Sequence, residues 1–231
     1  MILPLYLEHG FALIALAICM GIVYLLKDAA KLSCYKSIVY FRNAFVFFGL
    51  SVIVKYLFLW QYTLYRDIAF ETLFFTITFV LYGYFTLAAT FYLLSSILVK
   101  FFNEGERKGI PLIIFFHIIA ATAIISDLIL GHSFIQLTIL IVVLLVIVGL
   151  SIHHCLTPRG RPYIKQMFLL SMILFLVLVA FQLTMGQLAI VYPGAQMWIL
   201  LVTRIGTIAV FAIILFGVYE IFHRKRGLCD E

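Results

Sequence analysis

Six polar side chains occur within or at the edges of long apolar runs, where polar groups are costly and usually serve a function. Arginine and lysine bind anions, whereas carboxylates and amides pair with such cations or hydrogen-bond a polar ligand. The pattern therefore predicts an intramembrane polar network that could bind a ligand. Its candidate residues are Arg204, Lys55, Glu71, Asp127, Gln182 and Gln187.

Arg204 is the deepest of these charges. It lies about ten residues into the last apolar run, roughly 15 Å below the outer end of a helix. That depth would place it near the bilayer centre, where a guanidinium needs a partner. We expect the partner to be Asp127, Glu71, a tyrosine or a carbonyl, and the contact either ties helices together or serves a ligand.

Three further charges lie toward the side of the membrane that is assigned below as outside. Lys55, Glu71 and Asp127 occupy the outer parts of their runs, and Gln182 and Gln187 lie toward the outer end of another. Together they predict a polar pocket in the outer half of the protein. The alternatives are a Lys55 that reaches the interface and carboxylates that are simply solvated there.

Histidine on neighbouring helices could ligate haem iron. His117 and His154 both lie in the cytoplasmic half of the chain's apolar runs. His117 is roughly 10 Å inside its run, whereas His154 is at the end of the next one, so their levels match poorly. We predict no cofactor, and haem ligated by these two residues stays an alternative.

Sequence patterns of intramembrane enzymes do not occur in the chain. There is no HExxH metal motif, no GxSxG nucleophile motif and no aspartate-rich pair for magnesium. The cysteines form no CxxC pair, so a metal site is not predicted either. We therefore expect a protein that is not an enzyme.

The elements that must position these residues are membrane-spanning helices. The chain has 231 residues, 65% hydrophobic and 11% charged, against about half and about a quarter in soluble domains. At about 20 residues per crossing, it is expected to form one all-α transmembrane domain over residues 1–231, with about seven spans. The predicted spans are residues 11–26, 39–60, 68–99, 110–130, 134–152, 163–191 and 194–222.

Basic residues between the spans set the predicted orientation, because cytoplasmic loops retain positive charge. On one side the loops contain only Arg66, and the other Lys and Arg in the loops or close to the span ends fall on the opposite side. The N-terminus is therefore predicted outside and the C-terminus in the cytoplasm, in the plasma membrane. The cytoplasmic set is Lys27, Lys31, Lys36, Arg42, Lys100, Arg107, Lys108, Arg159, Arg161, Lys165, Arg224, Lys225 and Arg226.

The third span is predicted to be the central helix. It carries small and hydroxyl residues around Gly83, Ala88 and Thr90, which allow helices to approach closely. Tyr84 and Tyr92 accompany them, and a buried tyrosine hydroxyl needs a partner.

In span number, orientation and length the chain resembles small seven-helix receptors and microbial rhodopsins. The run Arg204-Ile205-Gly206 lies roughly where rhodopsins carry the lysine that binds retinal. That lysine is absent here, so a retinal Schiff base in this helix is not expected. The resemblance concerns topology, which many unrelated functions share.

These features favour a sensor or receptor with an outer polar pocket that signals through a separate cytoplasmic protein. Two alternatives remain open. The chain could be a structural subunit of a larger membrane complex, such as a respiratory one, or a small transporter or channel. Expected partners are the lipid bilayer and a membrane or cytoplasmic protein. Nucleic acid is not expected, because the basic residues form short clusters between apolar runs rather than one basic face.

Overall fold

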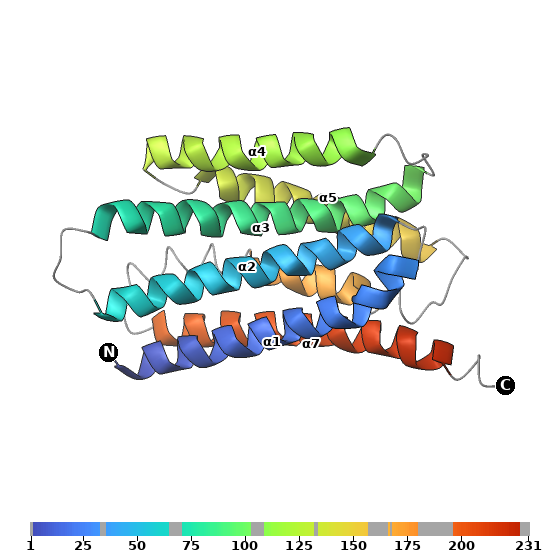
Figure 1. The fold of residues 1–231 in the computed structure, drawn as a ribbon, viewed down its shortest axis with the longest axis horizontal. Coiled ribbons are helices and arrows are strands. Elements are labelled where there is room, and N and C mark those ends of the chain that lie inside the picture. Colours follow the sequence, from blue (N-terminus) through green and yellow to red (C-terminus); the bar gives the residue numbers. More distant parts are fainter. Residues whose placement is uncertain are drawn as a thin grey trace. The chain divides into compact units, whose positions relative to one another are not determined.

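A computed structural model describes residues 2–32, 36–64, 71–102, 109–131, 134–156, 166, 168–179 and 196–226. These residues are all-α (Figure 1). The long helices are α1 (Ile2–Leu32), α2 (Lys36–Leu64), α3 (Glu71–Phe102), α4 (Gly109–Leu130), α5 (Phe134–Leu156) and α7 (Gln196–Arg226). A shorter apolar helix covers Phe168–Val179.

Six helices in the described part of the chain are long and apolar enough to cross a membrane, which makes this a multi-pass membrane protein. Their spans overlap six of the seven predicted from the sequence, and the Phe168–Val179 helix falls within the remaining one. The orientation of the chain in the membrane stays a prediction. The six spans are Leu7–Asp28, Lys36–Leu57, Thr76–Val99, Leu112–Leu130, Phe134–His153 and Leu201–Glu220.

Proline and glycine delimit the helices. Pro4 and Pro111 lie in the first turns of α1 and α4, where the missing N–H has no helical carbonyl to bond. Gly131 follows the last residue of α4 with a φ of 72°, a left-handed conformation that glycine adopts without strain. Long apolar runs without interior proline therefore stay helical, and α4 ends at a sharp turn.

The described helices form two compact units, and the second contains α2, α3, α4 and the start of α5, within Lys27–Val143. Here α3 lies between α2 and α4 (Figure 1). Ring contacts Phe47–Phe85 and Phe91–Phe116 join α3 to its two neighbours. Half of the α3 span is buried, against 22% of the α4 span. The prediction that this helix is central is thus confirmed within its unit.

Small and hydroxyl residues make the close packing of α3 possible. Ala88, Ala89 and Thr90 are at most 1% exposed. The hydroxyls of Thr90 and Ser95 donate to the carbonyls of Thr86 and Phe91, four residues earlier in the same helix. Such local bonds satisfy a hydroxyl in an apolar setting without requiring a partner from another helix. These side chains therefore serve packing.

The first unit contains α1 up to Leu26, the second half of α5, the Phe168–Val179 helix and α7. In it α1 and α7 lie side by side (Figure 1). Glu8 contacts Arg204, and Gly21 lies against Leu215, so sequence numbers rise together and the two helices are parallel. At Gly206 a Cβ atom would overlap the end of the Leu178 side chain, so α7 and the Phe168–Val179 helix approach closely beside Arg204.

Asp127 holds the turn between α4 and α5. It is 1% exposed, and its two carboxylate oxygens accept hydrogen bonds from the backbone N–H groups of Ile135 and Gln136, at 2.8 and 2.7 Å. The first N–H groups of a helix have no helical acceptor. A carboxylate bound there satisfies them and is favoured by the helix dipole. This contact fixes the start of α5 against the end of α4.

Substitution of Asp127 by alanine is expected to lower the free energy of unfolding by about 2 kcal/mol, because two buried amides lose their acceptor. Asp127→Asn, which keeps one acceptor oxygen, should cost less. The matched control is Asp28→Ala, which removes an exposed carboxylate. Thermal unfolding of the purified variants in detergent measures the difference. Equal midpoints for the Asp127 and Asp28 variants would contradict the capping role.

Candidate functional site

A salt bridge in the first unit joins α1 to α7. The Nε–H of Arg204 on α7 donates to Oε1 of Glu8 on α1, with a distance of 2.7 Å. The Glu8 side chain is 8% exposed and that of Arg204 23%. A charge-assisted bond of this length is roughly twice as strong as a neutral one. Arg204 therefore has the partner that its position in an apolar helix demands.

The two charges lie at the same level of the two parallel helices. Glu8 is about 28 Å along the helix axis from Lys27, and Arg204 is about 28 Å from His223, at about 1.5 Å per residue. Both distances approach the thickness of the hydrocarbon layer, about 30 Å. Since Lys27 and His223 belong to the basic ends of their helices, the pair is expected at the opposite boundary of the apolar layer. This level is shallower than the mid-membrane position expected for Arg204 from the sequence.

Glu8 is absent from the sequence-based candidates. The first span was predicted to begin at Phe11, which left Glu8 in an external flank. In the structure α1 begins at Ile2 and Glu8 is buried. In the sequence, Glu8 and Arg204 are equally far from the basic ends of their apolar runs. This equality could have predicted that the two residues contact each other.

The other predicted site residues are distributed as follows. Lys55 is half-buried in α2 and interacts with another group of the protein. Glu71 is the first residue of α3, and its side chain lies outside the described part, as do Gln182 and Gln187. Arg204 belongs to the first unit and Lys55 and Asp127 to the second. A pocket shared by all these residues therefore stays a prediction.

Asp127 was a candidate partner of Arg204 and a candidate ligand-binding group. In the described structure each of its oxygens accepts a hydrogen bond from a backbone amide at the start of α5. Its burial and its two short bonds indicate a structural carboxylate.

A second polar cluster surrounds His117 in the α2–α3–α4 unit. Its Nδ1 lies 2.9 Å from the hydroxyl of Tyr84, and its Nε2 lies 3.3 Å from that of Tyr92. Tyr84 and Tyr92 are about 12 Å apart along α3, so their side chains approach the imidazole from two directions. Phe47 of α2 stacks on Tyr92 at 5.1 Å between ring centroids. Both tyrosine hydroxyls thereby obtain the partner expected of them.

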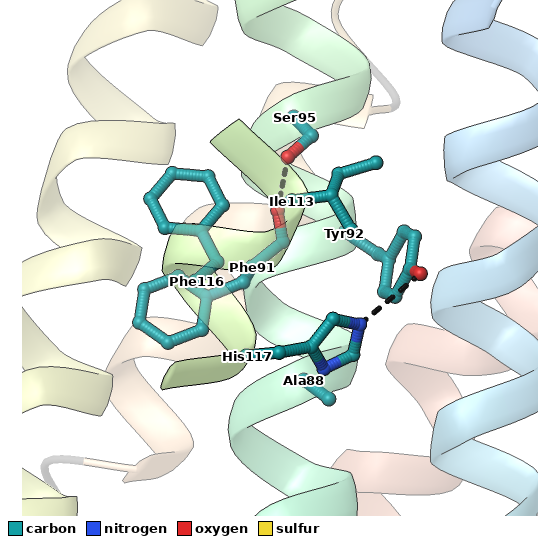
Figure 2. Close-up of a pocket in the computed structure, with 7 residues that line it drawn as sticks. All are labelled: Ala88, Phe91, Tyr92, Ser95, Ile113, Phe116 and His117. Carbon is teal, nitrogen blue, oxygen red and sulfur yellow. Dashed lines mark hydrogen bonds between the residues drawn. The ribbon is translucent and has the colours of Figure 1, made fainter. Parts of the chain in front are cut away.

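Beside His117 is a small hollow between α3 and α4, shown in Figure 2. It has room for about one water molecule. Because both ring nitrogens of His117 face tyrosine hydroxyls, an iron atom could bind only by displacing one of them. His154 lies in the helical part of α5 with its side chain outside the described part. The hollow is lined by Ala88, Phe91, Tyr92, Ser95, Ile113, Phe116 and His117.

Comparison with known proteins gives no relative for this chain. No protein-family model, curated protein or solved structure matches it. The argument for function therefore depends on the residues and their geometry alone.

A double-mutant cycle should detect the Glu8–Arg204 pair. We expect Glu8→Gln, Arg204→Gln and the double variant to show a coupling free energy of about 1.5–3 kcal/mol, the usual range for hydrogen bonds to charged groups. The cycle is needed because Glu8 has further interactions, which a single substitution also perturbs. Reversible unfolding in mixed micelles gives the four stabilities. Additive effects would show that the two charges act independently.

The His117 cluster predicts unequal effects of two neighbouring tyrosines. Tyr84→Phe should lower stability by about 1–2 kcal/mol, since it leaves Nδ1 of His117 without a partner. Tyr82→Phe is the matched control, because Tyr82 is 37% exposed, and it should stay within about 0.5 kcal/mol of the wild type. Thermal unfolding of both variants, side by side, provides the comparison. An equal loss in the two would argue against the histidine contact.

Proposed function

We propose that this protein is a membrane receptor or sensor, not an enzyme, whose recognition site is the Glu8–Arg204 pair. The observation that carries the proposal is a partly exposed arginine, held by a buried carboxylate, that joins the first and last helices. Ion pairs inside a membrane protein are costly and are commonly retained where a substrate, ion or signal acts on them.

The parallel packing of α1 and α7 supports the predicted topology. Four helices, α2 to α5, follow α1 in the chain, and a chain that crosses the membrane with each of them returns to the side where α2 began. For α7 to run parallel to α1, one further crossing is then needed between α5 and α7. The Phe168–Val179 helix lies in that interval. This favours seven crossings, with the two termini on opposite sides of the plasma membrane.

A route for the signal is provided by α7 itself. The helix is continuous from Gln196 to Arg226, so Arg204 is near one end and the basic residues are at the other. A change at the Glu8 contact shifts α7 against α1, and a rigid helix carries that shift to its far end. There the basic end of α7 would meet a separate cytoplasmic protein.

The Glu8–Arg204 ion pair also disfavours the alternative that the chain is a structural subunit of a larger complex. In that alternative the intramembrane charges make fixed contacts with neighbouring chains. Arg204 instead has its acceptor within its own chain. Its charge is thus balanced without a permanent partner subunit, which favours a protein that acts alone in the membrane.

The proposal predicts that weakening the Glu8–Arg204 contact changes the mobility of α7 at a distance from the contact. A spin label at Phe216, which is 50% exposed and about 18 Å from Arg204 along the helix, reports on this in a variant without the native cysteines. Glu8→Gln should change the mobility of the label measured by electron paramagnetic resonance in nanodiscs. Asp28→Asn, which also neutralises a carboxylate on α1, should leave it unchanged.

An unchanged spectrum in the Glu8 variant would mean that the pair only stabilises the first unit, and the receptor proposal would fail. Mass spectrometry of chains that copurify in mild detergent provides an independent check. A stoichiometric set of integral membrane subunits would favour the structural-subunit alternative instead.

A further inference from the structure

The hydrogen-bonding capacity of Arg204 exceeds what Glu8 uses. A guanidinium has five N–H donors, and Glu8 contacts the one on Nε. Within the part of the chain that the structure describes, no acceptor lies within hydrogen-bonding distance of the two terminal nitrogens of Arg204. No fully buried side-chain nitrogen or oxygen in that part lacks a partner, so these nitrogens reach the protein surface.

The geometry of the guanidinium limits what could bind there. Its two terminal nitrogens form a planar fork, which matches the two oxygens of a carboxylate or phosphate. Glu8 holds the Nε side of the group and so fixes the direction of the fork. A neutral ligand with a single acceptor would satisfy fewer of the donors, and a bare cation has no acceptor to offer them.

The surroundings increase the need for such an acceptor. At the boundary of an apolar layer, N–H groups without an acceptor are costly, and Arg204 is only 23% exposed. Its neighbour Gly206 is in close contact with Leu178, which limits how far α7 can turn to move the fork into water. The fork is therefore presented at a fixed place on the first unit.

We propose that the terminal edge of the Arg204 guanidinium binds an oxyanion, either a carboxylate or a phosphate group, and this rests on the proposed receptor function of the same site. The oxyanion takes the fork while Glu8 retains Nε. The oxyanion and the Glu8 carboxylate are attracted to the same guanidinium. Binding of the oxyanion therefore weakens the contact between α1 and α7. A lipid headgroup and a dissolved anion have the same chemistry and are told apart by experiment.

The test uses the full chain in non-ionic detergent with Trp60→Phe, which leaves Trp198 as the only tryptophan in a sequence that has two. Trp198 is 70% exposed and about 9 Å from Arg204 along α7. One arm adds inorganic phosphate or acetate, with chloride at the same ionic strength as reference. The other adds short-chain phosphatidic acid, with the corresponding phosphatidylcholine as reference. Trp198 emission and the thermal midpoint are recorded against concentration.

We expect a saturable change in at least one arm. Arg204→Lys should weaken the apparent affinity tenfold or more, because lysine keeps the charge but loses the fork. Arg204→Gln should abolish the response. The control Arg42→Gln removes an arginine of the second unit, whose Nη2 bonds the neighbouring Asn43, and should respond as the parent does. A response to phosphatidic acid alone identifies a lipid headgroup, and a response to the free anions identifies a soluble ligand.

No saturable response in either arm would overturn the oxyanion site, as would an unchanged affinity in Arg204→Lys. The latter variant keeps the positive charge beside Glu8, so it remains informative where Arg204→Gln fails to fold. The spin label at Phe216 separates the two proposals. Binding without a change of that label in nanodiscs leaves the site but removes the receptor function. A label that responds to Glu8→Gln without any oxyanion binding leaves the receptor function but removes this ligand class.

Discussion

In an apolar environment every polar group must find its partner within the protein, and the described structure is organised by this constraint. Water is not at hand to satisfy a hydroxyl or an imidazole in the membrane interior, and it is scarce at the boundary of the apolar layer, where Arg204 is expected. The hydroxyls of α3 bond to carbonyls of their own helix. His117 lies between two tyrosine hydroxyls. Arg204 takes a carboxylate from the other end of the sequence. Each of these contacts stabilises a different part of the fold.

The helices were predictable because their signal is local. About twenty apolar residues without interior proline can only be a helix in a bilayer, and the six long spans follow directly from that rule. The central place of α3 was also predictable, since Ala88, Ala89 and Thr90 offer little bulk at a helix interface. Composition and residue size are read from one segment at a time, without knowledge of the others.

The partners were not predictable because they depend on contacts between distant segments. The sequence shows that Arg204 needs an acceptor, but it does not choose between Glu8, Glu71 and Asp127. The choice follows from which helices pack together. Asp127 is drawn to the amides at the start of α5, only a few residues further along the chain. Glu8 reaches Arg204 because α1 and α7 are parallel and in register.

The two buried carboxylates show why one contact is suited to a switch and the other is not. Asp127 binds two backbone amides whose positions are fixed by α5, and these amides have no helical acceptor of their own. Glu8 binds one edge of a guanidinium and has further interactions besides. In the proposed function another oxyanion competes with Glu8 for the charge of that guanidinium, so its binding shifts the equilibrium between a tighter and a looser contact of α1 with α7. The ligand shifts these states by the difference in its affinity for them, whereas displacing Asp127 would leave the first amides of α5 without their acceptor.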